Sequence, residues 1–438
     1  MQEINKPGII EILGDWNYWN RDFEDYVPRD RYLEKIKLFR RSGEIIVLTG
    51  IRRSGKSTLL KLEMKDLAES VEKNNLLYIN FEDPRFPDNL NAKTLDLIFE
   101  AYREEINPEG EVYLFLDEVQ NVEGWERWVR TAHELKRAKI YVTGSSSKLL
   151  SGEIATSISG RYLRMDVYPL TFGEFLVFKG IECRTIGDYS SNKVSINRFF
   201  KEYLRYGGFP KIASVEEDLK KEELLSYFNT ILLKDVLARY KLRNYDMLRK
   251  LVKYLLTNDT KQNSINSVSR ALKFNYATVE DYVNYLRQVY MFFELRNFSY
   301  SLKKQLVSDI KYYSIDTGFV NAVSFTFSEN IGRLYENVVF NELERRGTEI
   351  FFLNEDGHEC DFIVKERNAV IAAYQVCYDL NKNNLEREVS GIAMACKKFG
   401  LDEGYIITDE VSRKIKQDGI KIRVVPITAF LLDLSKRF

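Results

Sequence analysis

The feature that most constrains the fold of this 438-residue chain is a glycine-rich segment at residues 50–57, with the sequence GIRRSGKS. It fits the pattern G-x-x-x-x-G-K-[ST], follows the apolar run IIVLT at 45–49 and leads into the helix-like residues TLLKL. Glycines let backbone N–H groups turn toward one point, and a helix N-terminus adds partial positive charge, so such a loop holds phosphate oxygens. The flanking strand and helix are the context that this pattern requires.

Apolar runs alternate with amphipathic segments through the first 170 residues. The runs are IIVLT at 45–49, LLYINF at 76–81, VYLFL at 112–116, KIYVT at 139–143 and a fifth candidate, RYLRMDVYPL, at 161–170. Short, fully apolar runs separated by helical segments predict buried, mainly parallel strands. Helices then cover both faces of the sheet, so the sequence predicts an α/β fold.

Two acidic residues follow the third apolar run. Asp117 and Glu118 come directly after VYLFL, at the carboxyl end of the predicted strand. Ligands of open α/β sheets bind at that end. We expect Asp117 to hold Mg²⁺ and Glu118 to orient and activate an attacking water molecule. Together with the phosphate-binding loop, this pair predicts a magnesium-dependent ATPase.

The predicted ATP-binding residues all belong to the glycine-rich loop and the first turn after it. They are Gly50, Ile51, Arg52, Arg53, Ser54, Gly55, Lys56, Ser57 and Thr58. Lys56 is expected to reach the β- and γ-phosphates, and Ser57 to ligate Mg²⁺. Arg52 and Arg53 either gather phosphate charge or pair with acids such as Asp83.

Two residues outside the loop are further catalytic candidates. Ser145, in KIYVTGSSS, either senses the γ-phosphate or belongs to a turn that caps the next helix. Arg161, in SGRYLR, is either an arginine finger directed at a neighbouring subunit or a surface arginine at the start of a strand. Both interpretations of each residue remain open.

Composition limits the class of protein. Lys plus Arg and Asp plus Glu each total 65, so the net charge gives no electrostatic reason to expect a nucleic-acid partner. Four cysteines without CxxC spacing and two histidines offer neither a zinc template nor a disulfide framework. The start MQEINKPGIIEILGDW lacks the charge and apolar pattern of a signal peptide, and no run of about 18 apolar residues occurs. We therefore expect a cytoplasmic protein with no membrane partner.

Changes in pattern along the chain predict five parts. The first is read as a loop followed by a helix from about Asp30, and the fourth contains a clear helix from Thr278 to Gln288, with Thr278 and Asp281 resembling a capping box. The boundaries are 1–40 for the lead-in, 41–172 for the nucleotide-binding core, 173–244 for a helical lid or linker, 245–302 for a winged-helix-like region and 303–438 for a second α/β domain.

Many short segments resemble one family, the prokaryotic AAA+ P-loop ATPases that couple the nucleotide domain to a winged helix and a C-terminal domain like a restriction endonuclease. The matching segments are GIRRSGKST, YINFEDPR, LFLDEVQNVEGWE, TGSSSKLLSG, PLTFGEF, YGGFP, LLKDVLARY, IDTG, GRLYENVVFNEL and ECDFIV. The resemblance implies ATP hydrolysis and assembly into a homo-oligomer. It also implies that the P-loop strand lies beside the strand that carries Asp117.

The resemblance places a nuclease-like cluster of the PD-(D/E)XK type in the C-terminal domain. Glu336, Asp361 and Gln375 match its metal-binding positions, but Cys377 stands where a lysine is expected. A thiol has neither the charge nor the three donors of an ammonium, and it is a poor Mg²⁺ ligand. Either the fold is kept without cleavage and serves docking, or a lysine from the next helix, at 397 or 398, replaces the missing one.

DNA is a candidate partner through residues 245–302 or the C-terminal domain. The helix from Thr278 to Gln288 offers polar side chains for a major groove, namely Asn284, Arg287 and Gln288. The same helix begins with Glu280 and Asp281, which repel phosphate, so a structural module between domains is the competing hypothesis.

Three functional hypotheses follow. The leading one is a magnesium-dependent ATPase that couples hydrolysis to a conformational change acting on a macromolecular partner. The alternatives are an ATP-regulated DNA nuclease and a nucleotide-gated scaffold that binds ATP with little turnover. Replacing Glu118 should trap bound ATP in the ATPase and change little in the scaffold.

Overall fold

The computed structural model of the protein describes residues 5–150, 160–324, 331–355 and 357–434, and it divides into two compact units, residues 1–167 and 168–438. The last two residues of the segment TGSSSKLLSG lie outside the described residues. No helix within the described ranges has both the length and the apolar character that crossing a membrane requires.

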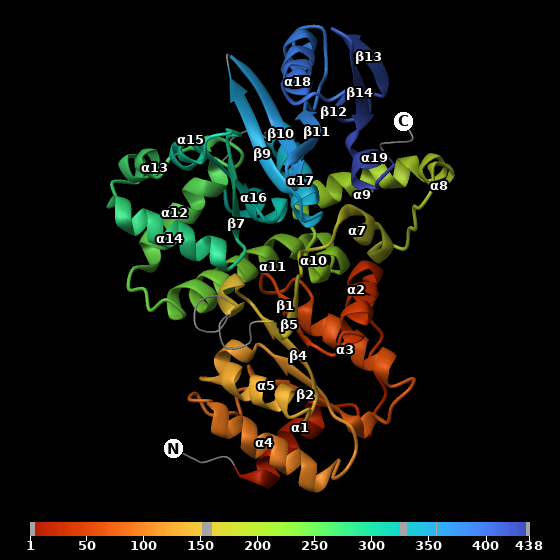
Figure 1. Ribbon diagram of the computed structural model, residues 1–438, viewed down its shortest axis with the longest axis vertical. Coiled ribbons are helices and arrows are strands. Elements are labelled where there is room, and N and C mark those ends of the chain that lie inside the picture. The colour runs from red at the N-terminus through yellow and green to blue at the C-terminus, as the bar shows by residue number, and fades with distance from the viewer. Residues whose placement is uncertain (1–4, 151–159, 325–330, 356, 435–438) are drawn as a thin grey trace. The chain divides into compact units, whose positions relative to one another are not determined.

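The first unit is built on a five-stranded parallel sheet with the strand order β2-β3-β4-β1-β5 (Figure 1). The strands are β1 (Ile45–Thr49), β2 (Leu76–Asn80), β3 (Tyr113–Asp117), β4 (Lys139–Gly144) and β5 (Tyr162–Asp166). All five predicted runs form strands, which confirms the α/β class. The expectation that the P-loop strand adjoins the Asp117 strand is wrong, because β4 lies between β1 and β3.

Helices pack on both faces of this sheet, as the alternation of strands and helices predicts. Side chains of β1 point alternately to the two faces: Ile45 and Val47 join one core, whereas Ile46 and Leu48 join the other. The first core includes residues of α1 (Lys6–Trp16), α4 (Ala92–Glu105) and α5 (Trp125–Glu134), and the second includes residues of α2 (Asp30–Arg40) and α3 (Lys56–Leu67). The sheet is therefore buried on both sides, which explains why β1 to β4 are mostly apolar, whereas β5 at the edge of the sheet carries charged residues.

Helix α1 corrects the prediction of a loop before Asp30. Asn5 accepts a hydrogen bond from Gly8 N at 3.0 Å, and a proline stands in the first turn, where its missing N–H costs nothing. Ile9, Ile12 and Leu13 recur at helical spacing and are buried. The aromatic and charged residues that follow α1 hid this short pattern, while α2 begins at Asp30 as predicted.

The second unit begins with helices and continues into a small three-stranded sheet. The first helices are α7 (Phe172–Phe178), α8 (Ile186–Ser191), α9 (Lys193–Tyr206), α10 (Pro210–Ser214) and α11 (Glu217–Thr230), followed by the π-helix η4 (Ile231–Ala238). Next come α12 (Tyr245–Thr257), β6 (Gln262–Asn263), α13 (Ile265–Leu272), α14 (Tyr276–Gln288), β7 (Phe292–Arg296), α15 (Leu302–Val307) and β8 (Ile310–Ser314). The sheet order is β6-β8-β7, with antiparallel pairing.

The start of α14 differs from the sequence prediction. The helix begins at Tyr276, two residues before the predicted Thr278, and Asn275 accepts a hydrogen bond from Ala277 N at 2.9 Å. The predicted capping box at Thr278 is therefore wrong. An asparagine is as good an N-cap as a threonine, and it stands earlier in the chain.

The C-terminal part of the second unit is a six-stranded mixed sheet with the order β13-β14-β12-β11-β10-β9 (Figure 1). Its strands are β9 (Glu349–Glu355), β10 (His358–Glu366), β11 (Ala369–Val376), β12 (Glu403–Thr408), β13 (Arg413–Gln417) and β14 (Ile420–Pro426). The accompanying helices are α16 (Thr317–Val323), α17 (Ile331–Arg345), α18 (Leu385–Phe399) and α19 (Ile427–Leu431). The hairpin, the third strand, the helix and the fourth strand match the predicted order.

Candidate nucleotide site

The glycine-rich loop connects the end of β1 to the start of α3. Gly50 has φ +150° and Gly55 has φ +99°, both in the region that favours glycine. A Cβ atom on Gly50 would lie 2.1 Å from the carbonyl oxygen of Val167. Residue 50 must therefore be glycine, because backbone from the end of β5 passes directly against the loop.

Lys56 lies buried at the N-terminus of α3. Its Nζ donates to the carbonyl oxygens of Gly50 at 3.0 Å and Ile51 at 3.1 Å, and lies 3.6 Å from Oε1 of Glu118. The loop and the end of β3 thus hold one ammonium group between them. A bound phosphate could therefore contact this ammonium group with little movement of the loop backbone.

Hydroxyl groups surround the carboxylate of Asp117 at the end of β3. The Tyr78 hydroxyl donates to Oδ2 at 2.6 Å, the Thr143 hydroxyl donates to Oδ1, and Ser57 supplies a further hydrogen bond. Burial and the neighbouring Glu118 carboxylate raise the pKa of Asp117. Ser57 and Asp117, the two predicted Mg²⁺ ligands, therefore lie together.

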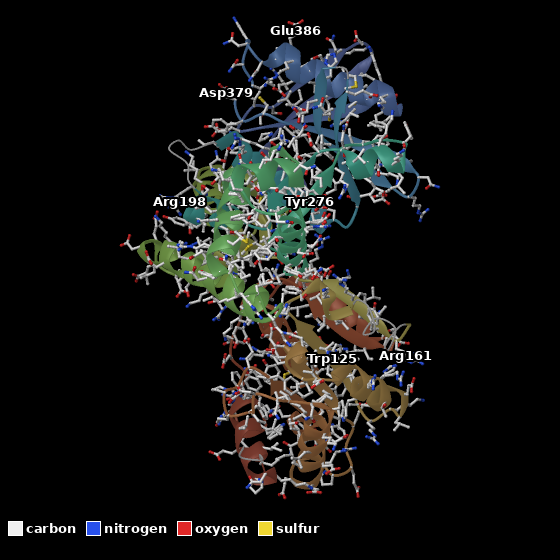
Figure 2. All side chains as sticks on the ribbon, turned by 90° about the vertical axis from the view of Figure 1, so that its left-hand side faces the viewer. Trp125, Arg161, Arg198, Tyr276, Asp379 and Glu386 are labelled. Atoms are coloured by element: carbon white, nitrogen blue, oxygen red, sulfur yellow. The ribbon has the colours of Figure 1, made fainter. Side chains whose placement is uncertain are left out.

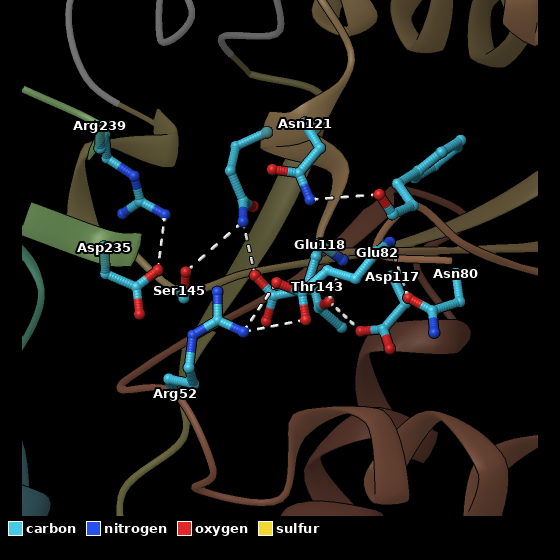
Figure 3. Close-up of polar contacts among 12 residues, drawn as sticks. Arg52, Asn80, Glu82, Asp117, Glu118, Asn121, Thr143, Ser145, Asp235 and Arg239 are labelled. Carbon is cyan, nitrogen blue, oxygen red and sulfur yellow. Dashed lines mark hydrogen bonds and ion pairs between the residues drawn. The ribbon is translucent and has the colours of Figure 1, made fainter. Parts of the chain in front are cut away.

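Glu118 has an unusual backbone conformation for a residue with a side chain. Its φ and ψ of 55° and 46° lie in the left-handed region, where non-glycine residues cost free energy and cluster at functional sites. Its N–H donates to Oγ1 of Thr143 at 2.9 Å, and Gln120 Nε2 donates to its Oε2 at 2.5 Å (Figure 3). Burial alone would raise its pKa, but Lys56 and Arg52 outweigh that effect and hold the pKa below its usual value.

The two loop arginines have different surroundings. Arg52 Nη1 lies 2.7 Å and 2.9 Å from the carboxylate oxygens of Glu82 (Figure 3). The expected partner, Asp83, instead accepts hydrogen bonds from Arg85 and from the indole of Trp16. Arg53 adopts φ +71° within the loop. The acid that pairs with Arg52 is therefore the neighbour of the predicted one.

Ser145 lies at the end of β4, on the same edge of the sheet as Glu118. It is buried, and its Oγ lies 3.4 Å from Gln120 Nε2, the same nitrogen that contacts Glu118 (Figure 3). Gln120 thus connects the hydroxyl of Ser145 with the carboxylate of Glu118. This contact suits a residue that reports the state of the site.

Within its own chain, Arg161 lies at the amino ends of the strands, whereas the glycine-rich loop lies at their carboxyl ends. Its carbonyl accepts a hydrogen bond from Ile45 N at the start of β1, whereas the P-loop follows the end of that strand. The guanidinium lies 2.8 Å from Glu134, at the end of α5, and its side chain is 41% exposed (Figure 2). Arg161 is thus separated from Lys56 and Glu118 within the chain and accessible from outside.

Four residues of this site escaped the sequence analysis as functional candidates. Tyr78 lies within an apolar run and carries no local signal. Thr143 is the last residue of the apolar run KIYVT, and Gln120 follows Glu118 in a short 3₁₀ turn. Arg29 is buried and donates to the carbonyl oxygen of Ser54 inside the loop at 3.0 Å. Their contacts cross between elements, so spacing along the chain does not reveal them.

The donor set at this edge fits a magnesium nucleotide. Ser57 and Asp117 provide the hard oxygen atoms that Mg²⁺ prefers, and Mg²⁺ in phosphate-transfer sites keeps few protein ligands besides waters and phosphates. The described residues contain no group of three or more His, Cys, Asp or Glu side chains placed to hold a metal ion. The left-handed glycines and Lys56 supply the phosphate-facing side of the site.

A second polar cluster lies within the C-terminal part of the second unit. Lys311, from β8, is buried, and its Nζ lies 3.1 Å from Glu336, 2.9 Å from Glu359 and 3.6 Å from Asp361. Burial and Glu336 raise the pKa of Asp361 to about 8, although Lys311 opposes this shift. A lysine therefore enters the predicted cluster, but from an element that the sequence analysis did not consider.

The lysines expected to replace the missing one lie elsewhere. Lys397 pairs with Asp418 at 2.7 Å, and Lys398 pairs with Glu355. Burial raises the pKa of the Cys377 thiol to about 11, so it stays protonated at neutral pH. Gln375 accepts a hydrogen bond from Asp361 N at 3.3 Å and donates to Glu388 at 2.8 Å, which keeps it beside the cluster.

The polar residues predicted on α14 are engaged within the second unit. Gln288 accepts a hydrogen bond from the Tyr240 hydroxyl at 2.6 Å, and Tyr285 stacks on Tyr240 with ring centroids 3.9 Å apart. Arg287 lies 3.3 Å from Glu294 on β7. These contacts favour the structural role of α14 over base recognition.

Models of known protein families match three parts of the chain. Residues 42–176 match an AAA domain, residues 197–330 match a domain of unknown function (DUF8612), and residues 331–430 match another (DUF4143). The first match covers the five-stranded sheet with its P-loop and supports the AAA+ type of ATPase fold.

Relatives align with nearly the whole chain, and two of them are 30% or more identical to it. Protein MJ1544 of Methanocaldococcus jannaschii is 36% identical over 434 residues, which cover 95% of this chain and 92% of the relative. A Haemophilus influenzae protein is 30% identical over 407 residues, which cover 90% of this chain and 96% of the relative. Both are described as uncharacterized.

Among solved structures, the Aeropyrum pernix ORC1 protein in complex with DNA is 12% identical and has a TM-score of 0.33. That alignment covers 68% of this chain and 94% of the ORC1 chain.

Proposed function

Because this chain belongs to the family of AAA-domain proteins that includes MJ1544 of Methanocaldococcus jannaschii, we propose that it is a magnesium-dependent ATPase in which hydrolysis drives a conformational change acting on a macromolecular partner. One observation carries the proposal. Four side chains lie together where the parallel strands end and interact with one another, namely Lys56, Ser57, Asp117 and Glu118.

Each residue has a distinct role in this proposal. The N–H groups of the loop and the Lys56 ammonium hold the phosphates, and Ser57 and Asp117 hold Mg²⁺. The bound metal supplies positive charge that neutralises phosphate oxygens. Glu118 is ionised at neutral pH, because its pKa lies below the usual value, so it can accept a hydrogen bond from the attacking water.

Ser145 and Arg161 complete the proposed site. Ser145 senses the γ-phosphate and transmits its presence to Glu118 through Gln120, which contacts both residues. Arg161 acts on the nucleotide of a neighbouring copy in a homo-oligomer, since in its own chain it lies at the amino ends of the strands. Arginine fingers of this kind stabilise transition-state charge in related enzymes.

We propose for the rest of the chain the domain boundaries of the sequence analysis. The order helix, strand, helix, helix, strand, short helix, strand in α12, β6, α13, α14, β7, α15 and β8 supports a winged-helix-like region, although β8 extends it past residue 302. The positions of Glu336 on α17, Asp361 on β10 and Gln375 on β11 support a domain like a restriction endonuclease.

Steady-state ATP hydrolysis tests the proposal, with Glu118→Gln as the variant and Glu109→Gln, an exposed glutamate of the same unit, as the matched control. Wild type and control should hydrolyse ATP when Mg²⁺ is present, whereas Glu118→Gln should bind ATP and retain it. The rate of hydrolysis should fall by roughly 10²–10⁴-fold, the contribution typical of a residue that accepts a proton from the attacking water. If wild type binds ATP without turnover under every condition, the nucleotide-gated scaffold replaces the ATPase.

The entry of Lys311 into the acidic cluster favours nuclease activity as a second candidate function. A lysine beside carboxylates is what a cleavage site of this type requires, and Cys377 does not supply it. Conversion of supercoiled plasmid to nicked circles with Mg²⁺ tests this function. Wild type and the exposed-residue control Asp418→Asn should nick, whereas Asp361→Asn should not. No nicking by wild type would leave the cluster a structural role.

A further inference from the structure

A hollow with a basic rim lies on the second unit, and its lining residues differ from those of the acidic cluster. Its volume is about 450 Å³, and residues of α11, α12 and α16 line it. Arg249, Lys250 and Lys253 of α12 form the basic rim, and Leu225 of α11 and Val323 of α16 contribute apolar surface. None of these residues belongs to a site already described.

The amphipathic pattern of α12 explains why the three cations gather there. Leu248, Leu251, Val252, Leu255 and Leu256 form the buried face of this helix. The three cations are exposed and stand one and three residues apart in turn, which places them on one side of a helix with 3.6 residues per turn. Because the apolar face of α12 is buried, the three cations on its other side are exposed to solvent.

Two of the three rim cations, Arg249 and Lys250, have no ionic partner in the described part of the chain. The hollow is lined by three cations and by one carboxylate, Asp246. Other cations of the unit are paired, such as Lys211 with Glu223 at 2.6 Å. A concave surface with uncompensated charge of one sign attracts ligands of the opposite sign.

Helix α14, the element that would read DNA in a winged helix, is a poor alternative. Gln288 is bound to Tyr240, Arg287 is paired with Glu294, and Glu280 and Asp281 are exposed near the start of the helix. An anionic polymer would meet carboxylates on α14 and mainly cations on α12. Of these two helices, α12 therefore offers the more favourable surface for a polyanion.

We propose that this hollow binds single-stranded nucleic acid. Arg249, Lys250 and Lys253 contact phosphates, while an unstacked base or sugar lies against the apolar surface of Leu225 and Val323. A basic groove combined with an apolar surface is the arrangement that suits single strands, whose bases are free to leave the stack. The inference names the partner class of the proposed ATPase, but the binding itself requires no ATP hydrolysis.

Fluorescence anisotropy with labelled oligo(dT), oligo(rU) and a duplex, without ATP and over a range of salt concentrations, tests the proposal on the full chain. Wild type should bind the single strands more tightly than the duplex. The double variant Arg249→Glu, Lys250→Glu should bind them more weakly by on the order of tenfold, and its salt slope should fall by about two, because two phosphate contacts are lost. Comparison of oligo(dT) with oligo(rU) separates DNA from RNA.

A matched control carries the same change in net charge. Lys303→Glu, Lys304→Glu alters two exposed lysines of α15 and should keep wild-type affinity. Unchanged ATP hydrolysis in both double variants shows that they are folded and separates this inference from the proposed catalytic function. Wild-type affinity in the α12 variant, equal binding of duplex, loss of binding in the α15 variant instead, or equal competition by polyglutamate would each overturn the proposal.

Discussion

Thr143 links the two acidic residues of the nucleotide site through one hydroxyl group. The hydroxyl donates to Asp117 and accepts from the backbone N–H of Glu118 at 2.9 Å. It therefore helps to hold Glu118 in its left-handed conformation, which costs on the order of 1–3 kcal/mol without such support. Thr143 is a positioning residue in this interpretation.

Replacing Thr143 by valine should lower ATP hydrolysis by about tenfold or more, because the carboxylate of Glu118 loses its fixed position. The buried N–H of Glu118 would be left without an acceptor, which should destabilise the protein by about 1–3 kcal/mol. Steady-state hydrolysis and urea unfolding measure the two effects. Thr143→Ser keeps the hydroxyl and should retain most of both; an equally large loss in the serine variant would show that the methyl group matters instead.

Residues of the two polar clusters differ in how far the sequence predicts them. Lys56 and Asp117 could be identified because the P-loop pattern and the strand end are local features of the chain. Lys311 could not, since its partners lie 25 or more residues away and on other elements. One signal was present: Lys311 stands inside the buried run IKYYS, and a lysine is rarely buried unless it is paired.

At the scale of elements, buried polar side chains connect β8 and α16 to their neighbours. Asp316 accepts hydrogen bonds from Gly208 N at 2.7 Å and Gly318 N at 2.9 Å, which joins the sequence segments YGGFP and IDTG. A Cβ on Gly207 would overlap the Asp316 carboxylate at 1.7 Å, so the glycine permits this approach. Sequence patterns identified both segments without showing that they touch.

Because the carboxyl group of Asp316 is buried, we expect the stability of the protein to depend on pH. Burial raises the pKa of Asp316 from 3.8 to about 7. Between these values the folded state holds a proton that the unfolded state has lost, so the free energy of unfolding falls as pH rises from about 4 to 7, by roughly 1.4 kcal/mol per pH unit from this group. Urea unfolding at several pH values should show a shallower decline in Asp316→Asn, which cannot titrate. If the free energy of unfolding declined equally with pH in wild type and in Asp316→Asn, Asp316 would not be the group that causes the decline.

The ion cluster around Lys311 also connects elements, since β8, α17 and β10 each contribute to it. Lys311→Met should destabilise the protein by on the order of 3–5 kcal/mol, because the partly buried carboxylate of Glu336 would lose its counter-charge beside the buried Asp361. Lys397→Met removes an exposed pair with Asp418 and should change the free energy of unfolding by about 0–1 kcal/mol. Denaturant unfolding compares them, and similar small losses in both variants would mean that Lys311 is not a structural counter-ion.

At the scale of the whole molecule, the sequence predicts the fold class and the order of elements along the chain better than it predicts which strands pair. Five alternating apolar runs identified the parallel sheet, because strands buried on both faces are uniformly apolar. The runs did not reveal that β4 separates β1 from β3, since strand order depends on long-range pairing. The same limitation applies to the acidic cluster, where β8 completes a site whose other residues lie beyond residue 330.

Division of the chain into two compact units predicts how ATP changes its stability. Each unit has its own core, so calorimetry should resolve two unfolding transitions rather than one. If ATP with Mg²⁺ binds the folded first unit as proposed, then at 100 times its dissociation constant it should stabilise that unit by about 2.7 kcal/mol. We therefore expect one transition to move to higher temperature while the other stays in place.

Lys56→Ala should remove this shift without removing either transition, because Lys56 contacts the phosphates and belongs to the first unit alone. Lys211→Ala, an exposed lysine of the second unit, provides the control and should retain the shift. If ATP moves both transitions equally, nucleotide binding also stabilises the second unit, and the expectation that the ligand acts on the first unit alone is wrong.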